Sequence, residues 1–134
     1  MHCCLREYVL NVTLTVKTTL ILGATPNPSR YAYLAAERLA SRGHEIVPVG
    51  VKHGRVQGRE ILHGKPDVPE IDTVTLYVGP QHQPEYYDWL LRVAPRRIIF
   101  NPGTENPELG RLARENGIEV VHGCTLVMLA GGSY

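Results

Sequence analysis

The stretch TLILGATPNPSRYAYLAAERLASRGHEIVPV, residues 19–49, decides the fold. It opens with the apolar run 20–22, which reaches Gly23 as a buried parallel strand does before a tight loop. A segment with apolar residues at helical spacing follows, and Gly43 is placed to end that helix just beyond its C-cap. Residues 45–49 then predict a second strand. A strand, a helix and a strand within about thirty residues predict a βαβ unit.

Three further apolar runs extend this pattern. Residues 73–78, 97–100 and 118–121 predict strands, and helical segments separate them. The intervening region 50–72 carries glycine, proline and histidine and leaves room for one short strand near Ile61-Leu62. Repeated strand–helix units imply right-handed crossovers between parallel strands. The expected fold class is α/β, with a doubly wound, Rossmann-like, mostly parallel five-stranded sheet and helices on both faces.

A proline that follows a polar residue is expected to open each main helix. The pairs are Asn27-Pro28, Gln83-Pro84 and Asn106-Pro107, and proline suits the first helical turn because no backbone N–H is needed there. Asn27, or Ser29 two residues on, is expected to cap the first helix. Sheets of this class bind ligands beyond the carboxyl ends of their strands, at the switch point beside the first strand. That rule places the expected site at residues 23–30.

Composition limits the function classes. The chain of 134 residues is 43% hydrophobic with a formal net charge of +1, which suits one packed core and lacks the basic excess of a general nucleic-acid binder. It contains no run of about 18 apolar residues, so no transmembrane helix is expected. Three cysteines, two of them adjacent, make a poor disulfide framework and favour a cytoplasmic location. Residues 1–18 lack signal-peptide features and predict either a frayed extension or an extra edge strand, before a folded domain over 19–134.

The first loop has the elements of an anion site without being a dinucleotide fingerprint. Only the first glycine of that fingerprint is present, at Gly23. Backbone N–H groups at the start of the following helix carry the positive end of its dipole. Thr25 and Ser29 offer hydroxyl groups, and Arg30 offers a planar fork suited to phosphate. An ordinary capped turn with a surface arginine is the alternative interpretation.

The segment after the second strand is basic. An NAD-binding sheet usually carries an acid about twenty residues past its glycines, and this chain has none there. Residues 50–65 carry four cationic side chains against one acid, a local charge of +3, whereas residues 66–91 carry five acids and neither lysine nor arginine. A cationic loop at this place suits a phosphorylated ribose. The alternative is a solvated basic loop.

Separated motifs in the right order give a family resemblance over more than four-fifths of the chain. They are GATPNPSR at 23–30, the lysine at 52, NPGTEN at 101–106 and GCTLVML at 123–129. From Thr19 to about Leu129 the sequence resembles the small stand-alone CoA-binding proteins, which are related to the N-terminal domain of the succinyl-CoA ligase α-subunit. Where that family commonly has Asn-Pro-Lys after the second strand, this chain has Gly50-Val51-Lys52.

The resemblance implies a ligand and the residues that hold it. The ligand is CoA or an acyl-CoA, with its pyrophosphate on the first loop and its 3′-phosphate near the basic residue after the second strand. The residues assigned in this way are Gly23, Ala24, Thr25, Asn27, Ser29, Arg30 and Lys52.

Other residues give weaker signals. Cys124 follows the last strand and is either a reactive thiol or, as we expect, a buried and inert small residue. The chain has no HxH, HExxH or CxxC spacing and no GxSxG elbow, so we expect no metal site and assign no catalytic residue. Tyr31 and Tyr33 either flank an adenine or belong to the core. Residues 101–106 are expected to form a turn and a helix cap, with any cleft contact secondary.

Three functions stay open at this level. The first is a non-catalytic module that binds CoA or an acyl-CoA. The resembling ligases add a second domain with a phosphorylated histidine and a nucleotide-binding subunit, and neither fits in these residues. The second is an NADP- or thiol-dependent redox enzyme that uses the same cleft with Cys124. The third is a regulatory domain acting through a protein partner, and a homo-oligomer is compatible with each of them.

Overall fold

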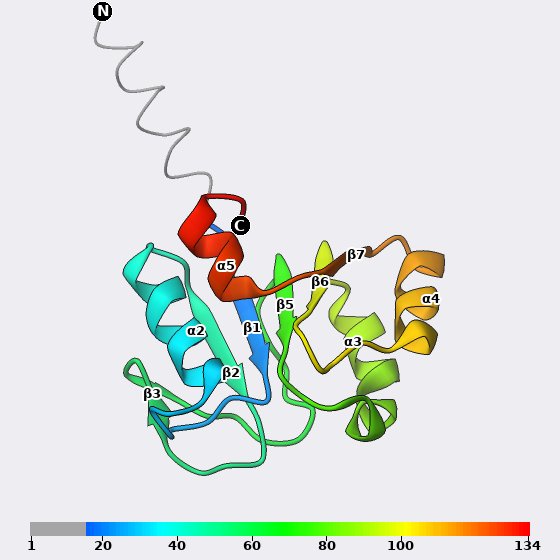
Figure 1. Ribbon diagram of the computed structural model, residues 1–134. Coiled ribbons are helices and arrows are strands. Elements are labelled where there is room, and N and C mark those ends of the chain that lie inside the picture. Colours follow the sequence, from blue (N-terminus) through cyan, green and yellow to red (C-terminus); the bar gives the residue numbers. More distant parts are fainter. Residues whose placement is uncertain (1–15) are drawn as a thin grey trace, which may run out of the picture.

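The computed structural model describes residues 16–134 (Figure 1). The predicted extension over residues 1–18 therefore lies almost wholly outside the described residues and stays a prediction. Within residues 16–134, no helix is both long enough and apolar enough to cross a membrane.

Five parallel strands form the central sheet. They are β1 (Thr19–Leu22), β2 (Ile46–Val49), β5 (Thr73–Leu76), β6 (Arg97–Phe100) and β7 (Glu119–His122). Their spatial order is β2-β1-β5-β6-β7, and every neighbouring pair is parallel. The chain thus winds outward in both directions from β1, which confirms the doubly wound α/β prediction. The last strand begins one residue later than predicted.

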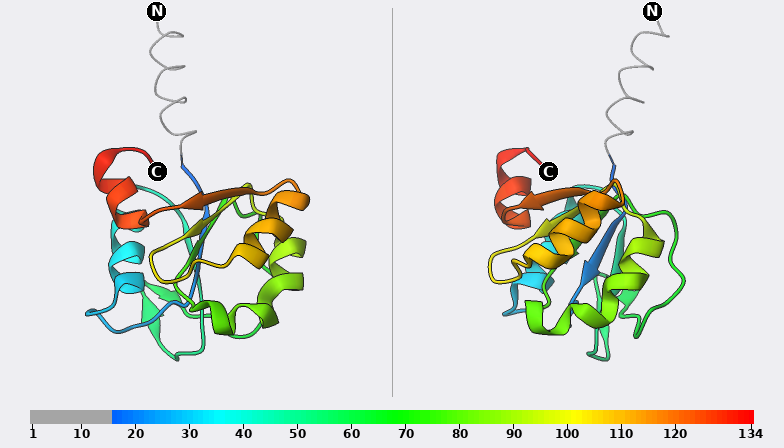
Figure 2. Two further views of the ribbon diagram at one scale, coloured as in Figure 1. Left: turned by 45° about the vertical axis from the view of Figure 1, so that its right-hand side comes forward. Right: turned by 90° about the vertical axis from the view of Figure 1, so that its right-hand side faces the viewer.

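Helices cover both faces of the sheet, as Figures 1 and 2 show. α2 (Tyr31–Ser41) and α5 (Thr125–Gly131) lie on one face, and α3 (Tyr87–Val93) and α4 (Pro107–Glu115) lie on the other. Side chains alternate along a strand, and β1 shows how this fills two cores. Leu20 and Leu22 join the cluster beneath α3 and α4, whereas Ile21 joins the cluster beneath α2 and α5.

The region between β2 and β5 contains an antiparallel hairpin, which the sequence did not predict. β3 (Arg55–Val56) pairs with β4 (Arg59–Glu60) across a turn in which Gln57 and Gly58 both have positive φ. Two central residues with positive φ give a tight hairpin turn, and glutamine is an unusual choice for the first. At the expected short strand there is only a single bridge, between Val49 and Leu62.

Two of the predicted helix starts are wrong. α2 begins at Tyr31 with Arg30 at its N-cap, and no side chain caps it. Asn27 is instead engaged by Ser29, whose backbone N and Oγ both donate to Asn27 Oδ1, at 3.0 and 2.8 Å. The segment at Gln83-Pro84 forms two 3₁₀ turns, η1 (Pro80–His82) and η2 (Pro84–Tyr86), before α3 begins.

Two other helix boundaries confirm the prediction. Asn106 caps α4, because its Oδ1 accepts from the backbone N–H groups of Glu108 and Leu109 at 3.1 and 3.3 Å. Gly43 follows the C-cap of α2 with φ of +85° and donates to the carbonyl of Ala40.

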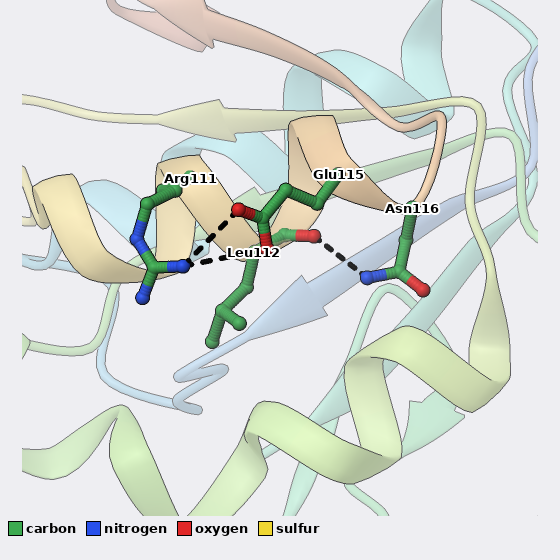
Figure 3. Close-up of polar contacts among 4 residues, drawn as sticks. All are labelled: Arg111, Leu112, Glu115 and Asn116. Carbon is green, nitrogen blue, oxygen red and sulfur yellow. Dashed lines mark hydrogen bonds and ion pairs between the residues drawn. The ribbon is translucent and has the colours of Figure 1, made fainter.

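The solvent-facing end of α4 carries ordinary surface interactions (Figure 3). Arg111 pairs with Glu115 one turn later, at 3.2 Å, and both side chains are more than half exposed. Asn116 Nδ2 donates to the carbonyl of Leu112 at 2.8 Å. Such exposed contacts contribute about 0–1 kcal/mol each, so the fold depends on the two buried clusters instead.

Candidate functional site

The loops after β1, β2 and β5 meet at the carboxyl edge of the sheet. Gly23, with φ of +100°, lies so close to the loop after β5 that a Cβ atom there would be 2.9 Å from the carbonyl carbon and oxygen of Tyr77. At the end of β2, a Cβ on Gly50 would be 2.7 Å from the carbonyl oxygen of Ala24. These glycines let three backbones approach where side chains would separate them.

The basic segment lies close to the first loop again at Gly54. A Cβ on Gly54, which has φ of +141°, would be 3.1 Å from the ring of Pro26. Lys52 and His53 come directly before Gly54 in the chain, and both are exposed. The structure therefore brings the predicted phosphate loop and the predicted basic loop together, although they are about twenty-five residues apart.

The first loop is organised by its own polar side chains. Asn27 N donates to Thr25 Oγ1 at 3.2 Å, and the backbone N of Arg30 donates to the carbonyl of Asn27 at 3.2 Å. The Ser29 hydroxyl donates to Asn27 Oδ1 at 2.8 Å, so it is engaged within the loop. Arg30 is exposed, and among residues 16–134 its guanidinium makes no hydrogen bond or ion pair. The loop is thus a preformed turn that ends in an unpaired cation.

The four cationic side chains after β2 differ in whether they are already paired within the protein. Arg59 pairs with Glu45 at 3.1 Å, and Arg55 donates to the carbonyl of Gly58 at 3.1 Å. The side chains of Lys52 and Lys65 are exposed and form neither kind of contact within the described chain. In the part of the chain that the structure describes, Lys52 is therefore an unpaired cation on the segment that adjoins the first loop.

Asn101 is buried and links three elements of the fold. The sequence had predicted mainly a turn and a helix cap for residues 101–106. Its Nδ2 donates to Thr75 Oγ1 at 2.7 Å and to the carbonyl of Leu76 at 2.8 Å, and its Oδ1 accepts from the backbone N of Thr125 at 2.9 Å. Thr75 and Thr125 also share a hydrogen bond between their hydroxyl groups at 2.8 Å. These contacts join β5, β6 and the start of α5. The turn itself is as expected, with Gly103 at φ of +92°.

Gln83 is an important residue that sequence reasoning took only for a helix start. It is fully buried, and its Nε2 donates to the carbonyls of Val78 and Thr104 at 2.9 and 2.8 Å. Its Oε1 accepts from Asn106 Nδ2 at 2.9 Å. Gln83 thereby fixes the loop after β5 to the loop after β6. A polar residue before a proline gives no sequence signal for these long-range contacts.

Cys124 is half-buried at the N-cap of α5, and so is more accessible than predicted. Nearby, the Tyr77 hydroxyl is buried and has no hydrogen-bond partner among residues 16–134. Burial raises the pKa of Tyr77 to about 12, so this phenol is neutral at physiological pH. This corner of the site therefore holds a thiol and a neutral hydroxyl group.

The remaining candidates differ in their burial. Tyr31 is 71% exposed, whereas Tyr33 packs against the cluster beneath α2 and α5. His122 is exposed and stacks on Phe100 at 5.4 Å. Within residues 16–134, no group of three or more His, Cys, Asp or Glu side chains is placed to hold a metal ion. Two shallow surface grooves lie elsewhere and are lined by no residue of the first loop.

Comparison with known proteins gives one family and several similar structures. The family model described as the CoA binding domain matches residues 17–130. A crystal structure of an uncharacterized protein is 57% identical with a TM-score of 0.88, and the match covers 90% of this chain and 99% of that one. A hypothetical protein from Pyrococcus horikoshii OT3 is 26% identical with a TM-score of 0.79, covering 94% of this chain and 89% of the other.

A larger enzyme shares the fold alone. The dinucleotide-forming acetyl-coenzyme A synthetase 1 of Ca. Korarchaeum cryptofilum, in complex with phosphate and ADP, is 16% identical with a TM-score of 0.62. The match covers 78% of this chain but only 25% of the synthetase. No curated protein matches the chain.

Proposed function

Because the chain belongs to the CoA binding domain family, we propose that it binds CoA or an acyl-CoA at the carboxyl edge of its sheet without catalysing a reaction of that ligand. The observation that carries the proposal is the contact between the first loop and the basic segment, which places Arg30 and Lys52 on adjoining loops as unpaired cations. A ligand with separated phosphate groups fits this charge arrangement.

Each loop has its own role in the proposal. Residues 23–30 hold the pyrophosphate: Gly23, Ala24 and Thr25 present their backbone to the ligand, Asn27 and Ser29 shape the turn, and Arg30 supplies charge. Lys52 meets the 3′-phosphate of the ribose. Family membership and the preformed turn support these roles.

The redox-enzyme alternative is less favoured. The first loop lacks two of the three fingerprint glycines, and no acid follows β2 to bind the hydroxyls of an NAD ribose. A reducing cytoplasm remains our proposed location because of the odd cysteine count, and a protein partner or a homo-oligomer remains compatible with the binding role.

Heat stability tests the ligand class. We expect CoA to raise the unfolding midpoint and NAD or NADP to leave it almost unchanged, because only a ligand that binds the native state stabilises it. At a hundredfold excess over Kd the gain is about 2.7 kcal/mol, or roughly 10 °C for a domain of this size. A thermal-shift screen checks this. A shift with NADP and none with CoA would refute the proposal.

Two substitutions separate the two phosphate contacts. Arg30→Ala should weaken CoA and dephospho-CoA alike, since both carry the pyrophosphate, whereas Lys52→Ala should weaken mainly CoA. A hydrogen bond to a charged group contributes about 1.5–3 kcal/mol, so losses of about tenfold or more are expected by calorimetry. Lys65→Ala, another exposed lysine on the same segment, is the matched control and should weaken CoA less than Lys52→Ala does and leave dephospho-CoA unchanged. Equal losses for both ligands in Lys52→Ala would remove Lys52 from the 3′-phosphate.

Cys124→Ser separates binding from thiol chemistry. We expect CoA affinity to stay within a few-fold, because serine keeps the size and position of the N-cap residue on α5. Calorimetry measures the affinity, and the rate of alkylation measures the reactivity of the thiol. Rapid labelling of Cys124 that CoA blocks would instead favour the thiol-dependent enzyme.

A further inference from the structure

Two histidines of the basic segment form a pair that the proposed function does not yet use. The rings of His53 and His63 lie with their centroids 4.4 Å apart at an interplanar angle of 48°, and both residues are exposed. His63 Nε2 lies 3.0 Å from the carbonyl oxygen of Lys52. A carbonyl only accepts, so this nitrogen carries the proton. Nδ1 of His63 can then take up a second proton without breaking that bond.

The charges around the pair are mostly positive. Lys52 precedes His53, Arg30 lies on the adjoining first loop, and Lys65 follows His63 by two residues. The hairpin adds the cations Arg55 and Arg59 and the acid Glu60. The Arg59 charge is paired with Glu45 of the segment before β2, and Glu60 lies opposite Arg55 in the hairpin register.

In this arrangement, the uptake of protons by the two histidines is coupled to the binding of an anion. Two protonated rings 4.4 Å apart, beside Lys52, repel each other. An anion bound beside the two rings offsets that repulsion, so a bound anion favours protonation of the pair, and protonation favours the anion by the same factor. Histidine is the residue whose charge ordinarily changes near neutral pH.

We propose that His53, His63 and Lys52 form a proton-dependent site for a phosphate monoester, which makes the protein prefer the 3′-phosphorylated ligand increasingly as pH falls. The inference rests on the proposed CoA binding, because the 3′-phosphate of CoA is the monoester concerned. Its placement follows from Gly54, which comes directly after His53 and contacts Pro26 of the first loop. A phosphate monoester loses its second negative charge near pH 6, so the preference levels off below that pH.

Calorimetry with CoA and dephospho-CoA tests this at pH 8.5, 7.5 and 6.5, in buffers of different ionisation enthalpy. One proton taken up on binding changes the affinity up to about tenfold per pH unit. We expect CoA affinity to rise about fivefold or more from pH 8.5 to 6.5, with net proton uptake, and dephospho-CoA affinity to change less than about twofold.

Variants assign the effect to the pair. In the double variant His53→Gln/His63→Gln, the rise in CoA affinity from pH 8.5 to 6.5 should shrink to the small change expected for dephospho-CoA. Each single variant should lose part of this rise. Glutamine at 63 can still donate to the Lys52 carbonyl, so the loop is expected to keep its shape. His122→Gln, an exposed histidine on edge strand β7, is the matched control and should behave as wild type.

The outcomes separate the two proposals. If CoA binds but wild type and the double variant take up protons equally, the histidine site is refuted and the CoA-binding proposal stands. The same holds if wild-type CoA affinity does not rise relative to dephospho-CoA. If neither ligand binds at any pH, the proposed function fails and the inference fails with it. Should the double variant not fold, the two single variants decide the question by the same criteria.

Discussion

Replacing Gly23 with alanine is expected to lower the free energy of unfolding by about 3 kcal/mol and to weaken CoA binding at least tenfold. Two costs add. The φ of +100° is strained for a residue with a Cβ, at about 1–2 kcal/mol. The new methyl group would also lie 2.9 Å from the carbonyl carbon and oxygen of Tyr77, which forces the loops after β1 and β5 apart at a further 1–3 kcal/mol or so. Urea unfolding measures the stability change.

Gly103→Ala is the matched control for this prediction. Gly103 has nearly the same backbone angle, with φ of +92°, but a Cβ there would meet no atom within 4 Å. Alanine at 103 should therefore show the strain of the backbone without the overlap, a loss of about 1–2 kcal/mol. The difference between the two variants isolates the close approach at Gly23. Equal losses would show that the contact with Tyr77 is unimportant.

The fold was predictable because local signals repeat along the chain. The strands β1, β5 and β6 are short and mostly buried, and each is followed by a loop and then a helix. Right-handed crossovers between parallel strands limit the possible arrangements to the doubly wound class that was predicted. The same regularity places residues 23–30 at the carboxyl edge of the sheet, where the sequence predicted this loop to lie.

The parts that sequence reasoning missed depend on contacts between distant residues. Gln83 bonds to Thr104 across a separation of 21 residues, and Asn101 bonds to Thr75 across 26. The hairpin turn at Gln57 breaks the usual preference for Asn, Asp or Gly at a positive φ, so it gave no signal. The histidine pair is ten residues apart in the sequence and meets only because the β3–β4 hairpin returns the chain. Spacing rules for metal or catalytic motifs do not describe such a pair.

The second large effect is expected for Asn101→Asp, with a loss of about 3 kcal/mol or more at pH 7. The side chain keeps its shape, but an oxygen replaces the Nδ2 that donates to the carbonyl of Leu76 at 2.8 Å. Two acceptors then face each other at a site that is only 2% exposed, and a charge is buried there. The hydrogen bond from the backbone N of Thr125 to Oδ1 is kept in the variant. The loss of stability therefore measures the missing Nδ2 donor together with the cost of the buried charge.

The dependence of this loss on pH identifies its cause. Burial raises the pKa of an aspartic acid above its unfolded value near 4, so the folded variant binds a proton more readily than the unfolded chain does. Relative to wild type, its stability should therefore recover as pH falls from 7 toward about 4.5, because the protonated acid can again donate to the Leu76 carbonyl. Chemical unfolding at several pH values measures this.

Asn116→Asp gives the comparison that makes the argument quantitative. Asn116 makes the same kind of bond, from its Nδ2 to the carbonyl of Leu112 at 2.8 Å, but it is exposed at the end of α4 (Figure 3). Water solvates the new carboxylate there, so the loss should stay below about 1 kcal/mol, and acid should restore little of it. A loss at Asn101→Asp no larger than at Asn116→Asp, or one that acid does not relieve, would show that the link between β5, β6 and α5 does not depend on the Asn101 amide. The loop after β6 would then be held at the site by Gln83 and its contacts to Val78 and Thr104 instead.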